Sequence, residues 1–126
     1  MAIPDTKLMV IVDDEMEILK VLKEVFELRK WTVMTTPTGN SVIPILEKNK
    51  VNIILLDIRL PDISGLDVLK EIKEKFQDLP VIIFTALGYE DTLVKKAFSL
   101  GAAGFVSKTV PLPELIEVVN NILVDK

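Results

Sequence analysis

Residues 8–14 read LMVIVDD and residues 53–57 read IILLD, so two short apolar runs end directly in aspartate. Two further runs behave alike, since 81–85 (VIIFT) ends in threonine and 105–108 (FVSK) leads into serine and lysine. Continuous apolar runs of this length are typical of strands buried on both faces of a parallel sheet. Ligands of such sheets bind beyond the carboxyl ends of the strands. The four runs therefore predict polar side chains gathered at one edge of one sheet.

The side chains expected at this edge differ in kind but suit one chemistry. They are three carboxylates, a hydroxyl and an ammonium group: Asp13, Asp14, Asp57, Thr85 and Lys108. Carboxylates bind divalent cations, whereas lysine and threonine pair with phosphate oxygens. The set predicts a site for a divalent metal and a phosphoryl group. The acidic pair taken alone would equally suit a turn or a helix cap, so the prediction depends on its combination with Asp57.

Amphipathic segments of helical length alternate with the apolar runs. Residues 31–36 have β propensity with more polar content, which indicates an edge strand. Pro44 lies inside the second amphipathic segment, so we expect that helix to begin near Val42 or to be kinked. Five strands, each followed by a helix, predict an α/β fold with a doubly wound parallel sheet. The helices are expected at 15–29, about 40–47, 66–76, about 90–100 and after Pro111.

Composition limits the function further. With 126 residues, 49% of them hydrophobic, the chain is expected to form one domain, 1–126. Its net charge of −4 argues against a general nucleic-acid surface. The chain has no cysteine and no histidine, which excludes disulfides, zinc bound by these residues and a Ser-His-Asp triad. Any metal is therefore expected to have oxygen ligands, which points to magnesium, manganese or calcium.

The motifs resemble the receiver domain of bacterial response regulators, the phospho-acceptor half of two-component signalling. The resemblance covers residues 8–123. Within the family, the chain is similar to single-domain regulators of the chemotaxis and sporulation types. It includes the acidic pair, the segment 57–66 (DIRLPDISGL), the threonine after the fourth strand and 98–108 (FSLGAAGFVSK). In this order and spacing the motifs form a specific signal. The family implies a flavodoxin-like fold with five helices and strand order 2-1-3-4-5.

The resemblance assigns Asp57 as the acceptor of a phosphoryl group from a histidine kinase or a histidine phosphotransfer protein. Asp14, Asp57 and the backbone carbonyl of Arg59 would bind Mg²⁺ directly, with Mn²⁺ as an alternative, and Asp13 would contribute through a bound water. A carboxylate nucleophile needs no base, which fits a chain without histidine. Without a cation, three neighbouring carboxylates should raise one another's pKa values.

The resemblance also implies how the signal leaves the site. Thr85 and Lys108 would each bind a phosphoryl oxygen. Phe105 would change position with Thr85, and phosphorylation would then reshape the surface of the fourth helix, fifth strand and fifth helix. A downstream protein, a fused output domain or a second copy of the chain, in a phosphorylation-dependent homodimer, would read this change.

One position differs from the family pattern, and two others lie where family members adjust the chemistry of the phosphoryl group. The family usually has proline after the lysine, with a cis peptide bond, whereas Thr109 follows Lys108 here. Either this bond is cis at a cost, or the loop is rearranged. Arg59 would reach toward the phosphoryl group or pair with an acidic residue. Leu87 cannot orient a hydrolytic water, which predicts slow loss of the phosphoryl group.

Two other functions fit parts of the pattern. A magnesium-dependent phosphohydrolase of the haloacid dehalogenase type would need an acid/base aspartate two residues after its nucleophile, where Arg59 follows Asp57 or Glu15 follows Asp13. A receiver-like module would instead bind partners without phosphate. The preferred interpretation is a signalling switch that catalyses only its own phosphorylation and dephosphorylation. No stretch resembles a signal peptide or a membrane span, so a cytoplasmic location without nucleic-acid or membrane binding is expected. The pattern suits a complete regulator and a receiver within a longer protein equally.

Overall fold

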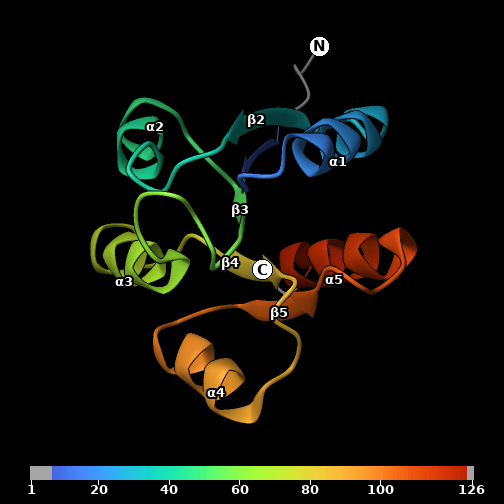
Figure 1. The fold of residues 1–126 in the computed structure, drawn as a ribbon. Helices are drawn as coiled ribbons and strands as arrows, with labels where there is room; N and C mark the ends of the chain where they lie inside the picture. Colours follow the sequence, from blue (N-terminus) through green and yellow to red (C-terminus); the bar gives the residue numbers. More distant parts are fainter. Residues whose placement is uncertain (1–6, 125–126) are drawn as a thin grey trace.

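A computed structural model describes residues 7–124 as a sheet of five parallel strands in the order β2-β1-β3-β4-β5, with a helix after each strand (Figure 1). This confirms the expected doubly wound sheet, its strand order and its five helices. The strands are β1 (Leu8–Val12), β2 (Thr32–Thr36), β3 (Ile53–Leu56), β4 (Val81–Thr85) and β5 (Gly104–Ser107). The helices are α1 (Met16–Leu28), α2 (Val42–Lys48), α3 (Gly65–Lys75), α4 (Asp91–Ser99) and α5 (Leu112–Val124).

The sheet is the middle of three layers. Helices α1 and α5 cover one face, and α2, α3 and α4 cover the other (Figure 1). Because successive side chains of a strand point to opposite faces, β1 contributes to both layers. Met9 and Ile11 pack with the residues of α1 and α5, whereas Val10 and Val12 pack with those of α2 and α3. Burial on both faces explains why β1 and β3 are apolar without alternation.

Local chemistry sets several element ends. Strand β2 is an edge strand, as its polar content predicts, and exposes Thr32 and Thr35. Helix α2 begins at Val42, so Pro44 lies in its first turn, where proline is tolerated. Helix α4 is followed by Gly101 at φ +103, a left-handed conformation that favours glycine and stops the helix.

Candidate functional site

Parallel pairing brings the ends of β1 and β3 to the same level. Val12 is aligned with Leu56, so Asp13 and Asp57 follow directly from two neighbouring strands. The backbone N–H of Asp57 donates to the carbonyl of Val12 at 3.0 Å and continues the ladder beyond the strand end. Asp13 and Asp57 are only 1% and 4% exposed, respectively. The strand ends therefore hold two buried carboxylates in fixed positions.

Asp14 completes an acidic cluster at this edge. One carboxylate oxygen from each of Asp13, Asp14 and Asp57 lies within 4.8 Å of the others. Asp14 is exposed, so the cluster is open to solvent on that side. An all-oxygen donor set of this size fits a hard cation such as Mg²⁺, which keeps several waters and needs few protein ligands.

Lys108 lies beside the cluster and contacts two of its members. Its Nζ is 2.7 Å from Oδ2 of Asp13 and 2.9 Å from Oδ2 of Asp57, and its side chain is 9% exposed. The backbone N–H of Lys108 donates to the carbonyl of Thr85 at 2.9 Å, which fixes the start of the loop after β5. The ammonium group of Lys108 thus lies at the same edge of the sheet as the aspartates, and its role toward a phosphoryl group stays a prediction.

The bond between Lys108 and Thr109 is trans, because residues 7–124 contain no cis peptide bond. The sequence left open a cis bond or a rearranged loop after Lys108, and the structure has a trans bond. The Ser107 hydroxyl lies 2.8 Å from the Thr109 hydroxyl and also accepts from the Thr109 backbone N–H at 3.2 Å. These local hydrogen bonds shape the loop without proline, and Lys108 still reaches both aspartates.

Burial and the contact between Asp13 and Lys108 shift the pKa of each of these two groups in opposite directions. Burial raises the pKa of Asp13 above its usual value, although hydrogen bonds from Lys108 and from the Glu15 backbone N–H oppose the rise. The charge of Asp57 raises the pKa of Asp13 further but is the smallest cause, so mutual repulsion of carboxylates is secondary to burial. Burial alone would lower the pKa of Lys108, but its carboxylate partners raise it above the ordinary value.

Thr85 and Phe105 lie near the cluster on neighbouring strands. Thr85 is buried, and its hydroxyl accepts a long hydrogen bond from the Leu87 N–H at 3.4 Å. Phe105 is half-buried and lies 6.0 Å from the Tyr89 ring, centroid to centroid, at an interplanar angle of 49°. Arg59 is exposed, and its backbone N–H is 3.4 Å from Oδ1 of Asp57.

Sequence reasoning missed three residues that hold this region together. The Glu15 carboxylate lies 3.1 Å from Nζ of Lys108. The Tyr89 hydroxyl accepts from the backbone N–H of Ser107 at 3.2 Å. Asp62 accepts from the backbone N–H groups of Gly39 at 2.9 Å and Asn40 at 2.8 Å, which ties the loop after β3 to the loop before α2. The hydrogen bonds from Asn40 and Gly39 hold the pKa of Asp62 below its usual value.

Mg²⁺ affinity is expected to be lower at about pH 5 than at about pH 8. The cation binds the ionised carboxylate, and the raised pKa of Asp13 lets protons compete at a higher pH than for an ordinary aspartate. Isothermal titration calorimetry at the two pH values checks this. Asp13→Asn is the control, because it should bind Mg²⁺ more weakly at both values but with a smaller pH dependence. Equal wild-type affinities would contradict the prediction.

A 2-1-3-4-5 parallel sheet with three carboxylates and a lysine at its carboxyl edge defines the receiver class of signalling domains. The family model of the response regulator receiver domain matches residues 9–120, and this chain belongs to that family. Members of the family are signalling switches, and receiver domains bind Mg²⁺ at an acidic pocket.

Individual relatives agree with this assignment. The response regulator SaeR of Staphylococcus aureus is 38% identical over 116 residues, which are 91% of this chain and 50% of SaeR. The chain thus spans about half the length of the curated relatives it matches. A CheY-like receiver domain protein from Methanospirillum hungatei has a TM-score of 0.91 at 25% identity, over 96% of each chain. Thermotoga maritima TrrA, solved in complex with Mg²⁺ and BeF, has a TM-score of 0.82 at 31% identity, over 93% of this chain and 99% of TrrA.

Proposed function

We propose that Asp57 of this chain is the phospho-acceptor of a two-component system. The observation that carries the proposal is the surroundings of its carboxylate. One of its oxygens lies with those of Asp13 and Asp14 within 4.8 Å, and its Oδ2 is 2.9 Å from Nζ of Lys108. A carboxylate that is nearly buried, yet faces a solvent-open acidic cluster and a cation, is equipped to receive a phosphoryl group.

Asp14, Asp57 and the backbone carbonyl of Arg59 would hold Mg²⁺ directly, and Asp13 would hold it through a water. Mn²⁺ would also suit this set of oxygen ligands. The cation, when bound, neutralises the charge of the carboxylate and of the incoming phosphoryl oxygens, which otherwise repel each other. The donor set supports this assignment because every candidate ligand is an oxygen.

The transfer itself needs few protein groups. An Asp57 oxygen attacks the phosphorus of a phosphohistidine, so an O–P bond forms and the P–N bond breaks, and the released imidazole takes a proton from water. Lys108 pairs with one phosphoryl oxygen, and the Thr85 hydroxyl turns from the Leu87 N–H to donate to another. Catalysis by positioning and charge neutralisation suffices for such transfers. Phe105 follows Thr85 and changes the surface around α4, β5 and α5.

Intact mass after incubation with acetyl phosphate and Mg²⁺ tests the proposal on the wild type and on Asp57→Asn. The wild type is expected to gain one phosphoryl group, and the variant none, because an amide is not a nucleophile toward phosphorus. Asp67→Asn is a matched control, since it makes the same change at an exposed residue in the first turn of α3 and should leave labelling intact. Equal labelling of wild type and Asp57→Asn would contradict the assignment.

Leu87 predicts a long-lived acyl phosphate. Its side chain is half-buried and packs against the core beside α3 and α4, next to Thr85. An aliphatic group there cannot orient a water for attack on phosphorus. Leu87→Glu and Leu87→Asn are therefore expected to shorten the half-life of the phosphorylated protein by about tenfold or more, less than the roughly 10²–10⁴-fold of full general acid–base catalysis because these side chains only orient the water. Decay of the phosphorylated mass with time measures it, and an unchanged half-life would count against the shielding role.

The wider setting is proposed from the family. A histidine kinase or a histidine phosphotransfer protein would supply the phosphoryl group, and a downstream protein, a fused output domain or a homodimer would read it. Residues 1–126 would form a single receiver domain in the cytoplasm, without direct nucleic-acid or membrane binding. Among residues 7–124, none of the helices has the length and apolar character needed to cross a membrane.

A further inference from the structure

Three carboxylate oxygens surround the ammonium group of Lys108. An ammonium group has three N–H donors. The three short contacts of Lys108 Nζ are to Oδ2 of Asp13 at 2.7 Å, Oδ2 of Asp57 at 2.9 Å and Oε2 of Glu15 at 3.1 Å. Transfer to Asp57 converts the carboxylate that contacts Lys108 into an acyl phosphate, so the phosphoryl oxygens then compete with the two remaining carboxylates, Asp13 and Glu15, for the N–H donors of Nζ.

The three contacts differ in how easily they are released. The side chains of Asp13 and Asp57 are 2% and 5% exposed, whereas that of Glu15 is 56% exposed. Phosphorylation removes the charge of the Asp57 carboxylate, whereas the buried Asp13 carboxylate stays charged and would lie in a medium that disfavours its charge if it lost its cation. An exposed carboxylate returns to water at little cost. Glu15 also makes the longest of the three contacts, so it is the partner that Lys108 gives up most readily.

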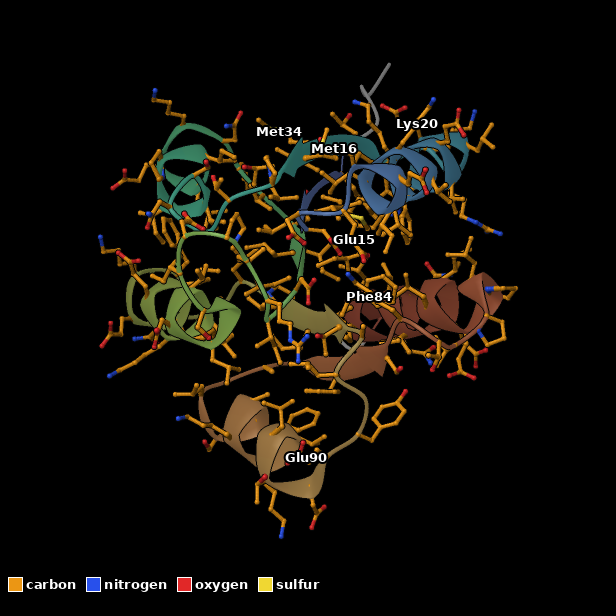
Figure 2. The ribbon with its side chains drawn as sticks, viewed as in Figure 1. Glu15, Met16, Lys20, Met34, Phe84 and Glu90 are labelled. Atoms are coloured by element: carbon orange, nitrogen blue, oxygen red, sulfur yellow. The ribbon has the colours of Figure 1, made fainter. Side chains whose placement is uncertain are left out.

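Backbone hydrogen bonds fix the position of Glu15 at the start of α1, where its side chain contacts Lys108. The N–H of Glu15 donates to Oδ1 of Asp13 at 2.9 Å, and its carbonyl accepts from Ile18 at 3.0 Å and Leu19 at 3.2 Å. Glu15 is the N-cap residue of α1, but its side chain makes no capping hydrogen bond. In Figure 2 Glu15 lies between the ribbons of α1 and α5. The Glu15 carboxylate thus lies near Lys108 and does not cap the N-terminus of α1.

We propose that Glu15 is a positioning residue that reserves, on Lys108, the donor which a phosphoryl oxygen takes after transfer to Asp57. The inference rests on the proposed phospho-acceptor function and extends it. In the resting protein Glu15 fills this donor, and on phosphorylation it yields the donor and turns to solvent. Glu15 consequently opposes binding of an anion at Asp57, while its negative charge favours a cation at the neighbouring aspartates.

Glu15 is expected to weaken anion binding at Asp57 and to strengthen cation binding at the aspartates. Because these two effects have opposite signs, loss of Glu15 can be distinguished from a general distortion of the site. Glu15→Gln removes the charge and weakens the contact to Lys108, so beryllofluoride, a mimic of the acyl phosphate, should bind about two- to fivefold more tightly at saturating Mg²⁺, the range that exposed ion pairs contribute. The same variant should bind Mg²⁺ alone more weakly than the wild type. A distorted pocket would instead weaken both.

Glu17→Gln is the matched control. It removes the same charge from the first turn of α1, but Glu17 is not one of the three partners of Lys108. Titration with beryllofluoride, followed by the ¹⁹F signal of the bound species, gives the affinity of each protein, and calorimetry gives the Mg²⁺ affinity. The expected result is tighter beryllofluoride binding for Glu15→Gln and an affinity close to wild type for Glu17→Gln.

The other outcomes are decisive as well. Weaker or unchanged beryllofluoride binding by Glu15→Gln, with normal binding by the wild type, would overturn the role of Glu15 and leave the phospho-acceptor function standing. Equal shifts in both variants would mean that charge alone acts, without the contact to Lys108, and would also overturn it. If the wild type did not bind beryllofluoride with Mg²⁺, the proposed function would fail and the role of Glu15 with it.

Discussion

Replacing Lys108 by methionine is expected to lower the free energy of unfolding at neutral pH, in magnesium-free buffer, by about 3 kcal/mol. The change removes the cation that lies 2.7 Å from Asp13 and 2.9 Å from Asp57 and leaves two buried carboxylates facing each other. Removing one partner of a buried ion pair costs this much because the remaining charge stays desolvated. Methionine replaces the unbranched side chain up to Cε and omits only the charged Nζ, so the effect reports mainly the lost charge.

The pH and magnesium dependence of this loss follow from the same contacts. The folded protein raises the pKa of Lys108 above its ordinary value of 10.5, so its stabilising contribution is complete below that pH and is lost only in stronger alkali. Mg²⁺ should restore much of the stability of the variant, because a bound cation replaces the missing charge. Urea unfolding with chelator and with Mg²⁺ measures both effects.

Lys95→Met is the control for Lys108→Met. Lys95 pairs with Asp91 at 3.5 Å on the surface of α4, and both side chains are more than three-quarters exposed, at 77% and 89%. Its loss should change stability by less than about 0.5 kcal/mol, with no response to Mg²⁺. A loss for Lys108→Met as small as that for Lys95→Met would show that the buried pairing contributes nothing to the fold.

Gly65→Ala is expected to destabilise the protein by about 3 kcal/mol and to disturb the acceptor loop. A Cβ atom at Gly65 would lie 2.0 Å from the carbonyl oxygen of Asp57 and 2.7 Å from Cα of Ile58. Both are backbone atoms, so no rotamer change relieves the overlap. The N–H of Gly65 also donates to the carbonyl of Ile58 at 2.7 Å, which holds the start of α3 against this loop. The strain must therefore move α3 or the backbone of Asp57.

Gly104→Ala separates this effect from the general cost of replacing a glycine. A Cβ at Gly104 would meet only side-chain atoms of α5 and β4, at 3.5 Å or more, which is ordinary van der Waals contact. That variant should keep the stability and phosphorylation rate of the wild type. Chemical denaturation and labelling by acetyl phosphate check both variants. A Gly65→Ala protein as stable and as readily labelled as Gly104→Ala would contradict the close approach.

The sequence was sufficient for what depends on local pattern. The apolar runs predicted the strands within one or two residues. Pro44 predicted either a start of α2 near Val42 or a kink, and the structure has the start at Val42, which leaves proline in the first turn. Asp13 and Asp57 were predicted as neighbours because the strand ends of a parallel sheet share one edge. These predictions required only periodicity, proline chemistry and topology.

Contacts between distant loops were not predictable in this way. Glu15 and Lys108 are 93 positions apart, and no periodicity links a residue before α1 to one after β5. Asp62 reads as one more polar residue of a loop, yet it anchors the backbone N–H groups of Gly39 and Asn40. Such pairs depend on the distances between loops in three dimensions, so only the structure assigns them.

The hydroxyl of Tyr89 also has a consequence for association of the protein. Strand β5 is an edge of the sheet, and Lys108 directs its N–H toward β4, so the N–H of the preceding Ser107 points to the open side. Tyr89 caps this group at 3.2 Å. An uncapped edge is a template for pairing with another strand. Tyr89 therefore caps this N–H group at the edge of β5 while its ring lies beside that of Phe105. A rearrangement that moves Tyr89 away would expose the N–H group of Ser107 to pairing with another strand.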